Sequence, residues 1–83
     1  MRLAEDCKVE ILGNHDQDFQ GINRKLVEFL DNKFPESVVS LVSYGPNGMV
    51  GVRGTAGNLH FSYLLRIGEG VKVLDVSLQG RTS

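Results

Sequence analysis

Residues 59–67 read LHFSYLLRI and carry the clearest strand signal in the chain. Large apolar side chains alternate with other side chains over the whole segment, which is typical of a strand with one buried face. The apolar set is Leu59, Phe61, Tyr63, Leu65 and Ile67. A slip of one residue in the strand pairing would expose all of these side chains, so the pattern fixes the register as well as the strand.

Two strands are predicted before this segment, at 38–44 (VVSLVSY) and 49–54 (MVGVRG). The turn Gly45-Pro46-Asn47-Gly48 joins them, because proline presets φ and Asn-Gly tolerates positive φ. Glycine recurs at every third position from Gly45 to Gly57, but only one proline accompanies it. Collagen needs many such triplets and abundant proline, so a collagen-like structure is excluded. A looser turn is expected over 54–58.

The last strand is predicted at 71–78, after a tight turn at Gly68-Glu69-Gly70. Simple alternation places its side chains on two faces. One face carries Leu74, Val76 and Leu78, and the other carries Val71, Val73 and Asp75. Asp75 is interpreted as an edge-strand charge that discourages unwanted pairing.

The N-terminal part predicts a strand and then a helix. Residues 7–12 (CKVEIL) alternate, with Cys7, Val9 and Ile11 expected on a buried face. Apolar residues then recur at helical spacing over 18–33, after Asp16 or Asp18 as the N-cap. Pro35 ends the helix and places Phe34 outside it. Together these elements predict a single α+β domain over residues 1–83. Its two layers have the order β-α-β-β-β-β, with one helix packed on a mostly antiparallel five-stranded sheet.

Charge, hydropathy and the number of cysteines exclude several classes of protein. The net charge is −1, and no apolar run approaches the length of a membrane span. Cys7 is the one cysteine, which excludes an internal disulfide and indicates a reducing compartment. We expect a buried, inert thiol, no membrane association and a cytoplasmic location.

No motif for chemistry is found. His15, Asp16 and Asp18 share a loop, but they lack the ligand number or spacing of a zinc or calcium site. The glycines match no phosphate-binding loop, and neither a GxSxG motif nor a cysteine–histidine pairing is evident. The sequence therefore predicts no catalytic residues, no metal and no cofactor.

One group of basic residues is a candidate binding surface. Arg53, His60 and Arg66 are expected on the face opposite the apolar rows, and Lys72 and Arg81 extend this group toward the C-terminus. The forked donors of arginine suit both phosphates and carboxylates, so the partner would be a phosphate group or an acidic molecule. An ordinary solvated sheet face is the alternative interpretation, since no aromatic residues are interleaved for nucleic-acid binding.

A resemblance to a known family extends from about Gly21 to Arg81. The helix NRKLVEFLDN, the glycine-rich turn and the segment MVGVRGTAGNLHFSYLLRIGEGVKVLDVSLQGR resemble RelE/HigB-type ribosome-dependent mRNA endonuclease toxins. The resemblance implies that Arg53, His60 and Arg81 hold the RNA backbone and stabilise charge at the scissile phosphate. This chain has room for one helix where two are usual in these families, and its net charge is slightly acidic.

The function predicted first is therefore a small non-catalytic protein-binding or regulatory module, such as a phage or host inhibitor. A toxin-like endonuclease that acts on ribosome-bound RNA is the alternative. A homodimer is also expected as a form of the protein, because Leu64 and Val73 are predicted on the face opposite the core, where paired sheets would cover them.

Overall fold

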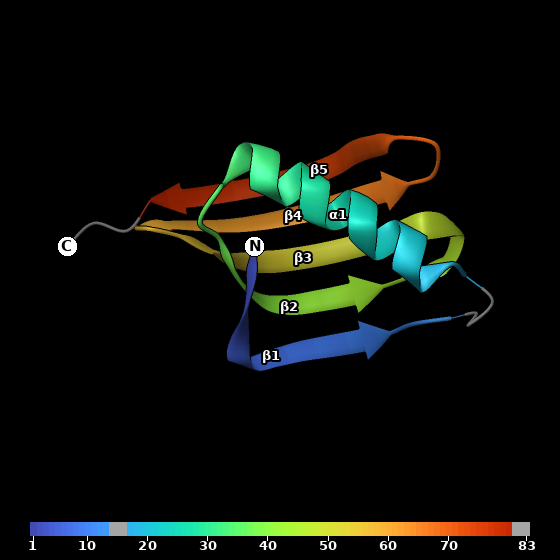
Figure 1. The fold of residues 1–83 in the computed structure, drawn as a ribbon, viewed down its shortest axis with the longest axis horizontal. Helices are drawn as coiled ribbons and strands as arrows, with labels where there is room; N and C mark the ends of the chain where they lie inside the picture. Colours follow the sequence, from blue (N-terminus) through green and yellow to red (C-terminus); the bar gives the residue numbers. More distant parts are fainter. Residues whose placement is uncertain (14–16, 81–83) are drawn as a thin grey trace.

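The computed structural model describes residues 1–13 and 17–80 and shows one helix packed on a five-stranded sheet (Figure 1). The strands are β1 (Arg2–Ile11), β2 (Val38–Tyr44), β3 (Met49–Ala56), β4 (Leu59–Ile67) and β5 (Val71–Gly80), and they lie in the sheet in this order. Helix α1 (Phe19–Lys33) follows β1, and a short 3-10 turn, η1 (Pro46–Gly48), separates β2 from β3. β1 is parallel to β2 and the other neighbouring pairs are antiparallel, which confirms the predicted fold class.

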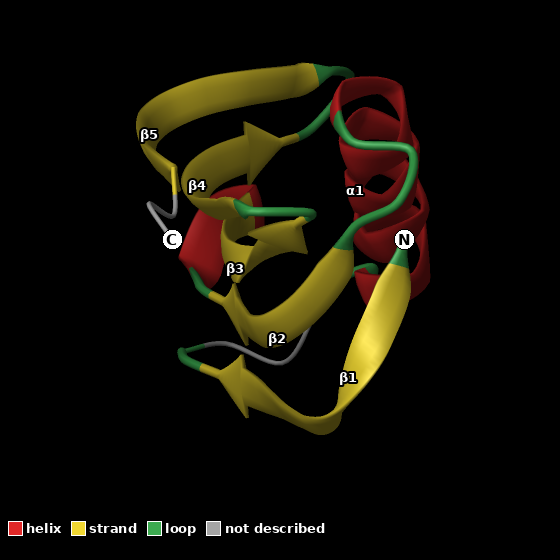
Figure 2. Cartoon of the chain, turned by 90° about the vertical axis from the view of Figure 1, so that its left-hand side faces the viewer, coloured by secondary structure: helices red, strands yellow, loops and turns green. Residues whose placement is uncertain are grey.

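The core lies between α1 and the central strands of a curled sheet (Figure 2). Leu26 and Leu30 of α1 are fully buried, as the helical spacing predicted. The sheet contributes Val39, Val42, Val50, Val52, Phe61, Tyr63, Leu65 and Ile67. Phe61 also stacks on Phe34, with ring centroids 4.9 Å apart. We call the face of the sheet that packs on α1 the helix side and the opposite face the outer face.

Both ends of α1 follow from their sequence. The Asp18 carboxylate accepts a hydrogen bond from the Gly21 N–H at 3.1 Å, which satisfies one of the free donors of the first turn. Phe34 has extended backbone angles and ends the helix before Pro35, as predicted. The other N-cap candidate, Asp16, lies outside the described residues.

The β2–β3 turn is fastened to the start of α1 by one side chain. Gln17 Nε2 donates to the Gly45 carbonyl at 2.6 Å, and Gln17 Oε1 accepts from the Gly48 N–H at 2.9 Å. Asn47 in this turn has φ of 58° and Gly48 has φ of 78°, which fits the predicted use of Asn-Gly. Gln17 therefore satisfies backbone groups that the turn cannot pair by itself.

Several predicted boundaries are wrong, and β5, for example, ends at Gly80 rather than at residue 78. The turn expected over 54–58 is shorter, because β3 continues to Ala56 and only Gly57 and Asn58 separate it from β4. Gly54 lies inside the strand, where its missing side chain allows a close contact. β1 begins at Arg2 rather than at residue 7, and the Arg2 N–H donates to the Ser37 carbonyl at 2.8 Å. Its pairing with β2 is irregular, since residues 4–7 stand opposite Ser40 alone.

The predicted faces of β5 are also wrong. A bulge at Leu74 shifts the register, so Val73 pairs with Leu65 and Asp75 pairs with Leu64. Val73 therefore lies on the helix side, beside a fully buried neighbour, and not on the outer face. One extra residue reverses the alternation that the sequence pattern assumed. Leu64 does lie on the outer face, where it is 37% exposed.

Candidate protein-binding surface

Four of the basic residues predicted as a binding surface lie on the outer face, but they form two separate groups. Arg53, His60, Arg66 and Lys72 all occupy positions of β3, β4 and β5 whose side chains point away from α1. Arg81 lies outside the described residues. Arg66 and Lys72 are direct cross-strand partners near one end of the sheet. Arg53 and His60 are diagonal neighbours farther along β3 and β4.

A row of residues without a basic side chain separates these two basic pairs. It contains Gly51 of β3, Leu64 of β4 and Asp75 of β5, which are paired across the three strands. Next to Arg53 and His60 the outer face has a shallow hollow of about 380 Å³. Its lining is Ser40, Arg53, Gly54, Thr55, His60, Phe61, Ser62, Ser77 and Gln79. The predicted patch is therefore two separate basic pairs in a single chain.

The basic side chains have few partners. Arg66 Nη2 lies 3.7 Å from the Met49 sulfur, a weak contact. Residues 1–13 and 17–80 contain one ion pair, between the Met1 ammonium and the Asp31 carboxylate, and it lies far from the outer face. Arg53, Arg66 and Lys72 are thus exposed cations without a carboxylate partner among the described residues, available to a partner molecule.

Apolar side chains on the two edge strands form a surface that sequence reasoning missed. On β5, Val73, Val76 and Leu78 lie on the helix side and are 42%, 44% and 51% exposed. On β1, Val9 and Ile11 are 59% and 45% exposed, although a buried face was predicted for them. Cys7 on β1 is half-buried rather than buried. In Figure 1, α1 runs diagonally across β5, β4 and β3, and β1 lies beyond the helix.

The width of one helix limits how much of the sheet it can cover, and it accounts for the exposure on β1. An α-helix with its side chains is about 10 to 12 Å across, and strands lie about 4.8 Å apart. One helix therefore covers about two or three strands, and this sheet has five. The sequence already predicted one helix against five strands, and this count indicates that part of the sheet stays uncovered.

The two edges differ in how they are protected from pairing with another chain. β1 carries five charged residues and an irregular register, both of which discourage strand addition. β5 has the same length as β1, also lacks proline and has its own bulge at Leu74, but it carries two charged residues, Lys72 and Asp75, against the five of β1. All its residues except Val71 are exposed. Because β5 is the last strand of the sheet, the backbone groups that point away from β4 have no partner strand among the described residues, although the Val76 N–H donates to Asp75 Oδ1.

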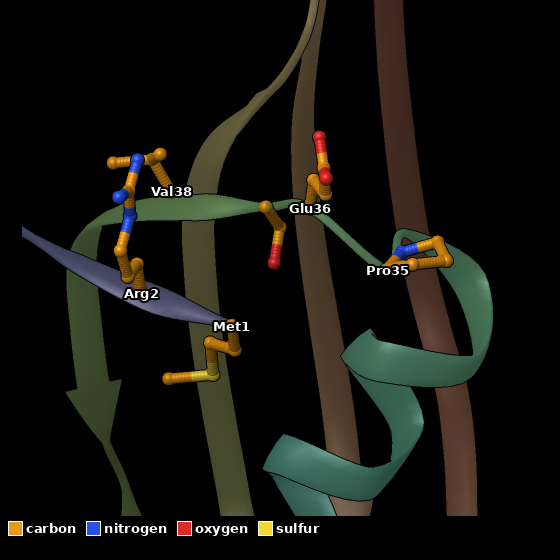
Figure 3. A pocket seen from close by; sticks show the side chains of 6 residues that line it. Met1, Arg2, Pro35, Glu36 and Val38 are labelled. Atoms are coloured by element: carbon orange, nitrogen blue, oxygen red, sulfur yellow. The ribbon is translucent and has the colours of Figure 1, made fainter.

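A second hollow lies where the N-terminus meets the segment between α1 and β2 (Figure 3). It measures about 400 Å³ and is lined by Met1, Arg2, Pro35, Glu36, Ser37 and Val38. Ser37 is 2% exposed, and its hydroxyl has no hydrogen-bond partner among the described residues. The sequence did not indicate this site, because a single serine directly before a strand occurs in many proteins without a special role.

The structure gives no further chemical centre in the parts of the chain that it describes. Residues 1–13 and 17–80 contain no group of three or more His, Cys, Asp or Glu side chains placed to hold a metal ion. Within the same residues, α1 is too short and too polar to cross a membrane. No protein-family model, curated protein or solved structure matches this chain.

Proposed function

We propose that this chain is a small non-catalytic protein-binding module of the regulator or inhibitor kind, which acts in the cytoplasm. One observation supports this function best. The edge strand β5 combines open backbone groups with a row of exposed apolar side chains, Val73, Val76 and Leu78. Such an edge is a template for a partner strand, and the apolar row adds contact area beside it.

The binding surface is then β5, and not the basic pairs alone. Backbone hydrogen bonds to an added strand supply affinity, and the alternating side chains of β5 supply selectivity. Val73, Val76 and Leu78 lie on one face on the two sides of the bulge, so a partner strand with apolar residues opposite them would extend the core beyond β5.

Affinity capture with three baits tests this function. The wild type, Val76→Lys and Val9→Lys are each used to capture proteins from an extract of the source cells. Val76 and Val9 are both exposed apolar residues of edge strands, so the second variant is a matched control. We expect one set of captured proteins to be lost with Val76→Lys and retained with Val9→Lys. Capture that is equal for all three baits would contradict the proposed surface.

The endonuclease alternative is supported by one feature, the neighbouring positions of Arg53 and His60 beside the outer hollow. A cation and an imidazole in one hollow are a suitable pair for holding and cleaving an RNA phosphate. If the alternative is right, the purified chain cleaves ribosome-bound mRNA, and His60→Ala and Arg53→Ala reduce cleavage without loss of stability. Captured ribosomes that disappear after nuclease treatment would favour it over the binding module.

A further inference from the structure

We propose that β5 pairs antiparallel with β5 of a second copy of this chain, around a two-fold axis between Leu74 and Asp75. The two sheets then form one continuous sheet of ten strands, twice the five of a single chain. This inference rests on the proposed function, because it names the partner of the same strand edge.

The face pattern of β5 is symmetric about its bulge. Val71, Val73, Val76 and Leu78 pair with buried residues of β4 and lie on the helix side. Lys72, Asp75 and Ser77 pair with outer-face residues, and the bulged Leu74 follows Val73 onto the outer face. Reading outward from the Leu74–Asp75 bond in either direction, the faces are outer, helix side, outer, helix side.

A two-fold antiparallel pair requires such a symmetric pattern, because residues that stand opposite each other share a face. With the axis at the Leu74–Asp75 bond, Val71 stands opposite Leu78 of the second copy and Val73 stands opposite its Val76. The apolar rows of the two copies then join on the helix side. A shift of the register by one residue places helix-side residues opposite outer-face residues on both sides of the axis. A shift by two residues does so beside the axis, where Val73 would face Leu74 or Asp75 would face Val76. The bulge therefore favours the proposed register.

The charges of β5 agree with this register. Lys72 stands directly opposite Ser77 of the second copy. Asp75 of the second copy is two residues from Ser77 and is therefore a diagonal neighbour of Lys72. Symmetry makes two such Lys–Asp pairs, and no like charges stand opposite each other. Within one chain Lys72 has no ion-pair partner among the described residues, so the second copy supplies the missing carboxylate.

One local contact changes when the copies pair. In the single chain, Asp75 Oδ1 accepts a hydrogen bond from the Val76 N–H at 2.9 Å, so this backbone donor next to the bulge is satisfied. In the dimer that N–H is free to donate to a carbonyl of the second copy, and the Asp75 carboxylate turns to Lys72 of the second copy. The local contact therefore protects the edge in the monomer and does not block the pair.

Light scattering coupled to size-exclusion chromatography measures the assembly. We expect the wild-type mass to approach twice 9.1 kDa over micromolar concentrations and Val76→Lys to remain at 9.1 kDa. Val9→Lys, on the other edge strand, should leave the dimer unchanged. Far-UV circular dichroism shows whether each variant is folded. A wild type that stays monomeric, or a dimer that only Val9→Lys disrupts, overturns the proposal.

Disulfide trapping tests the register and does not depend on a destabilising charge. In a Cys7→Ser background, Lys72→Cys combined with Ser77→Cys should give covalent dimers on mild oxidation, because these positions face each other across the axis. Residues 72 and 77 of one strand are about 16 Å apart, too far for a disulfide within a chain. Lys72→Cys combined with Asp75→Cys reports a register shifted by two residues. Dimers from this second pair alone, or from neither pair, overturn the proposed register.

Failure of this inference is distinct from failure of the proposed function. If the wild type is monomeric but its captured proteins are lost with Val76→Lys, β5 binds a different protein and only the second copy is excluded. If the wild type is monomeric and Val76→Lys captures the same proteins as the wild type, both proposals fail.

Discussion

Gly54 occupies the tightest place in the sheet. A Cβ at this position would lie 2.8 Å from Phe61 Cζ and 3.0 Å from Val39 Cα, and it would collide with the Val38 carbonyl oxygen. Two of these obstacles are backbone atoms of β2, which cannot move without breaking strand pairs. We expect Gly54→Ala to lower the free energy of unfolding by about 3 kcal/mol or more. Urea denaturation monitored by circular dichroism measures the loss.

Gly51 is the matched control for this substitution, since it lies in the same strand. A Cβ there would meet Ser43 Cβ at 3.8 Å, which is an ordinary van der Waals contact. Gly51→Ala should therefore leave stability unchanged or raise it slightly, because alanine restricts the unfolded chain more than glycine does. If both variants lose the same stability, close packing is not the reason for Gly54. The regular spacing of the glycines predicted turns, but the sequence did not show which glycine serves close packing.

Tyr44 gives the protein an alkaline sensitivity. Burial raises the pKa of Tyr44 above 10.0, and electrostatic repulsion from the nearby Cys7 raises it further. Its hydroxyl donates to Asn23 Oδ1 at 3.2 Å, and its ring packs edge-on against Phe19. As the pH rises through 10, the unfolded chain releases this proton before the folded chain does, so stability falls above that pH and is unaffected below it.

Tyr44→Phe removes this titration. We expect the free energy of unfolding of the variant to fall less steeply above pH 10 than that of the wild type, in denaturation series at matched ionic strength. Cys7→Ser should reduce the slope by a smaller amount, because Cys7 is the second cause of the shift. Identical slopes for the wild type and Tyr44→Phe would show that another group is responsible.

At the scale of elements, regular alternation was predictable and irregularities were not. The bounds of β2 and β4 match the sequence pattern residue for residue, and the pairing of β3 with β4 is regular throughout. The irregularity at Ser40 in the pairing of β2 with β3 had no signal in the sequence. The bulge at Leu74 changed the face of Val73, because the adjacent apolar residues Val73 and Leu74 fit either face equally well. Register is decided by pairing with β4, which one sequence does not display.

Gln17 determines how α1 and the β2–β3 turn are joined, and no pattern in the sequence indicated it. Its amide makes one hydrogen bond as donor and one as acceptor to the backbone of this turn. We expect Gln17→Ala to lower the free energy of unfolding by about 1 to 3 kcal/mol, since both backbone partners lie in a partly buried place. Thermal and urea unfolding measure the effect.

The control for Gln17 is Gln20→Ala, an exposed residue in the first turn of α1. This substitution should be neutral or slightly stabilising, because alanine is the better helix former. A loss for Gln20→Ala equal to that of Gln17→Ala would assign the effect to the helix start and not to the turn.

For the whole molecule, the number and order of the elements were predictable, but the extent of the covered surface was not. A strand pattern reports that a face is apolar, and it does not report whether a helix reaches that face. The predicted basic surface has a related limit, because its two pairs are separated in one chain. In the proposed dimer, Lys72 and Arg66 of one copy continue the row of Ser77, Ser62 and Arg53 of the other copy. Assembly would thus join basic residues that one chain keeps apart.

Amide hydrogen exchange should show that the edge strand β5 gains a partner strand and that the edge strand β1 does not. Strands β3 and β4 are paired on both sides and carry most of the core, so their amides should exchange most slowly. At low concentration, the outward-pointing amides of β1 and β5 should exchange rapidly. Raising the concentration should slow exchange in β5 alone, because only that edge gains a partner strand, and Val76→Lys should abolish this dependence. Concentration-dependent protection of β1 would instead place the contact between copies on the opposite edge, where five charged side chains and an irregular register oppose it.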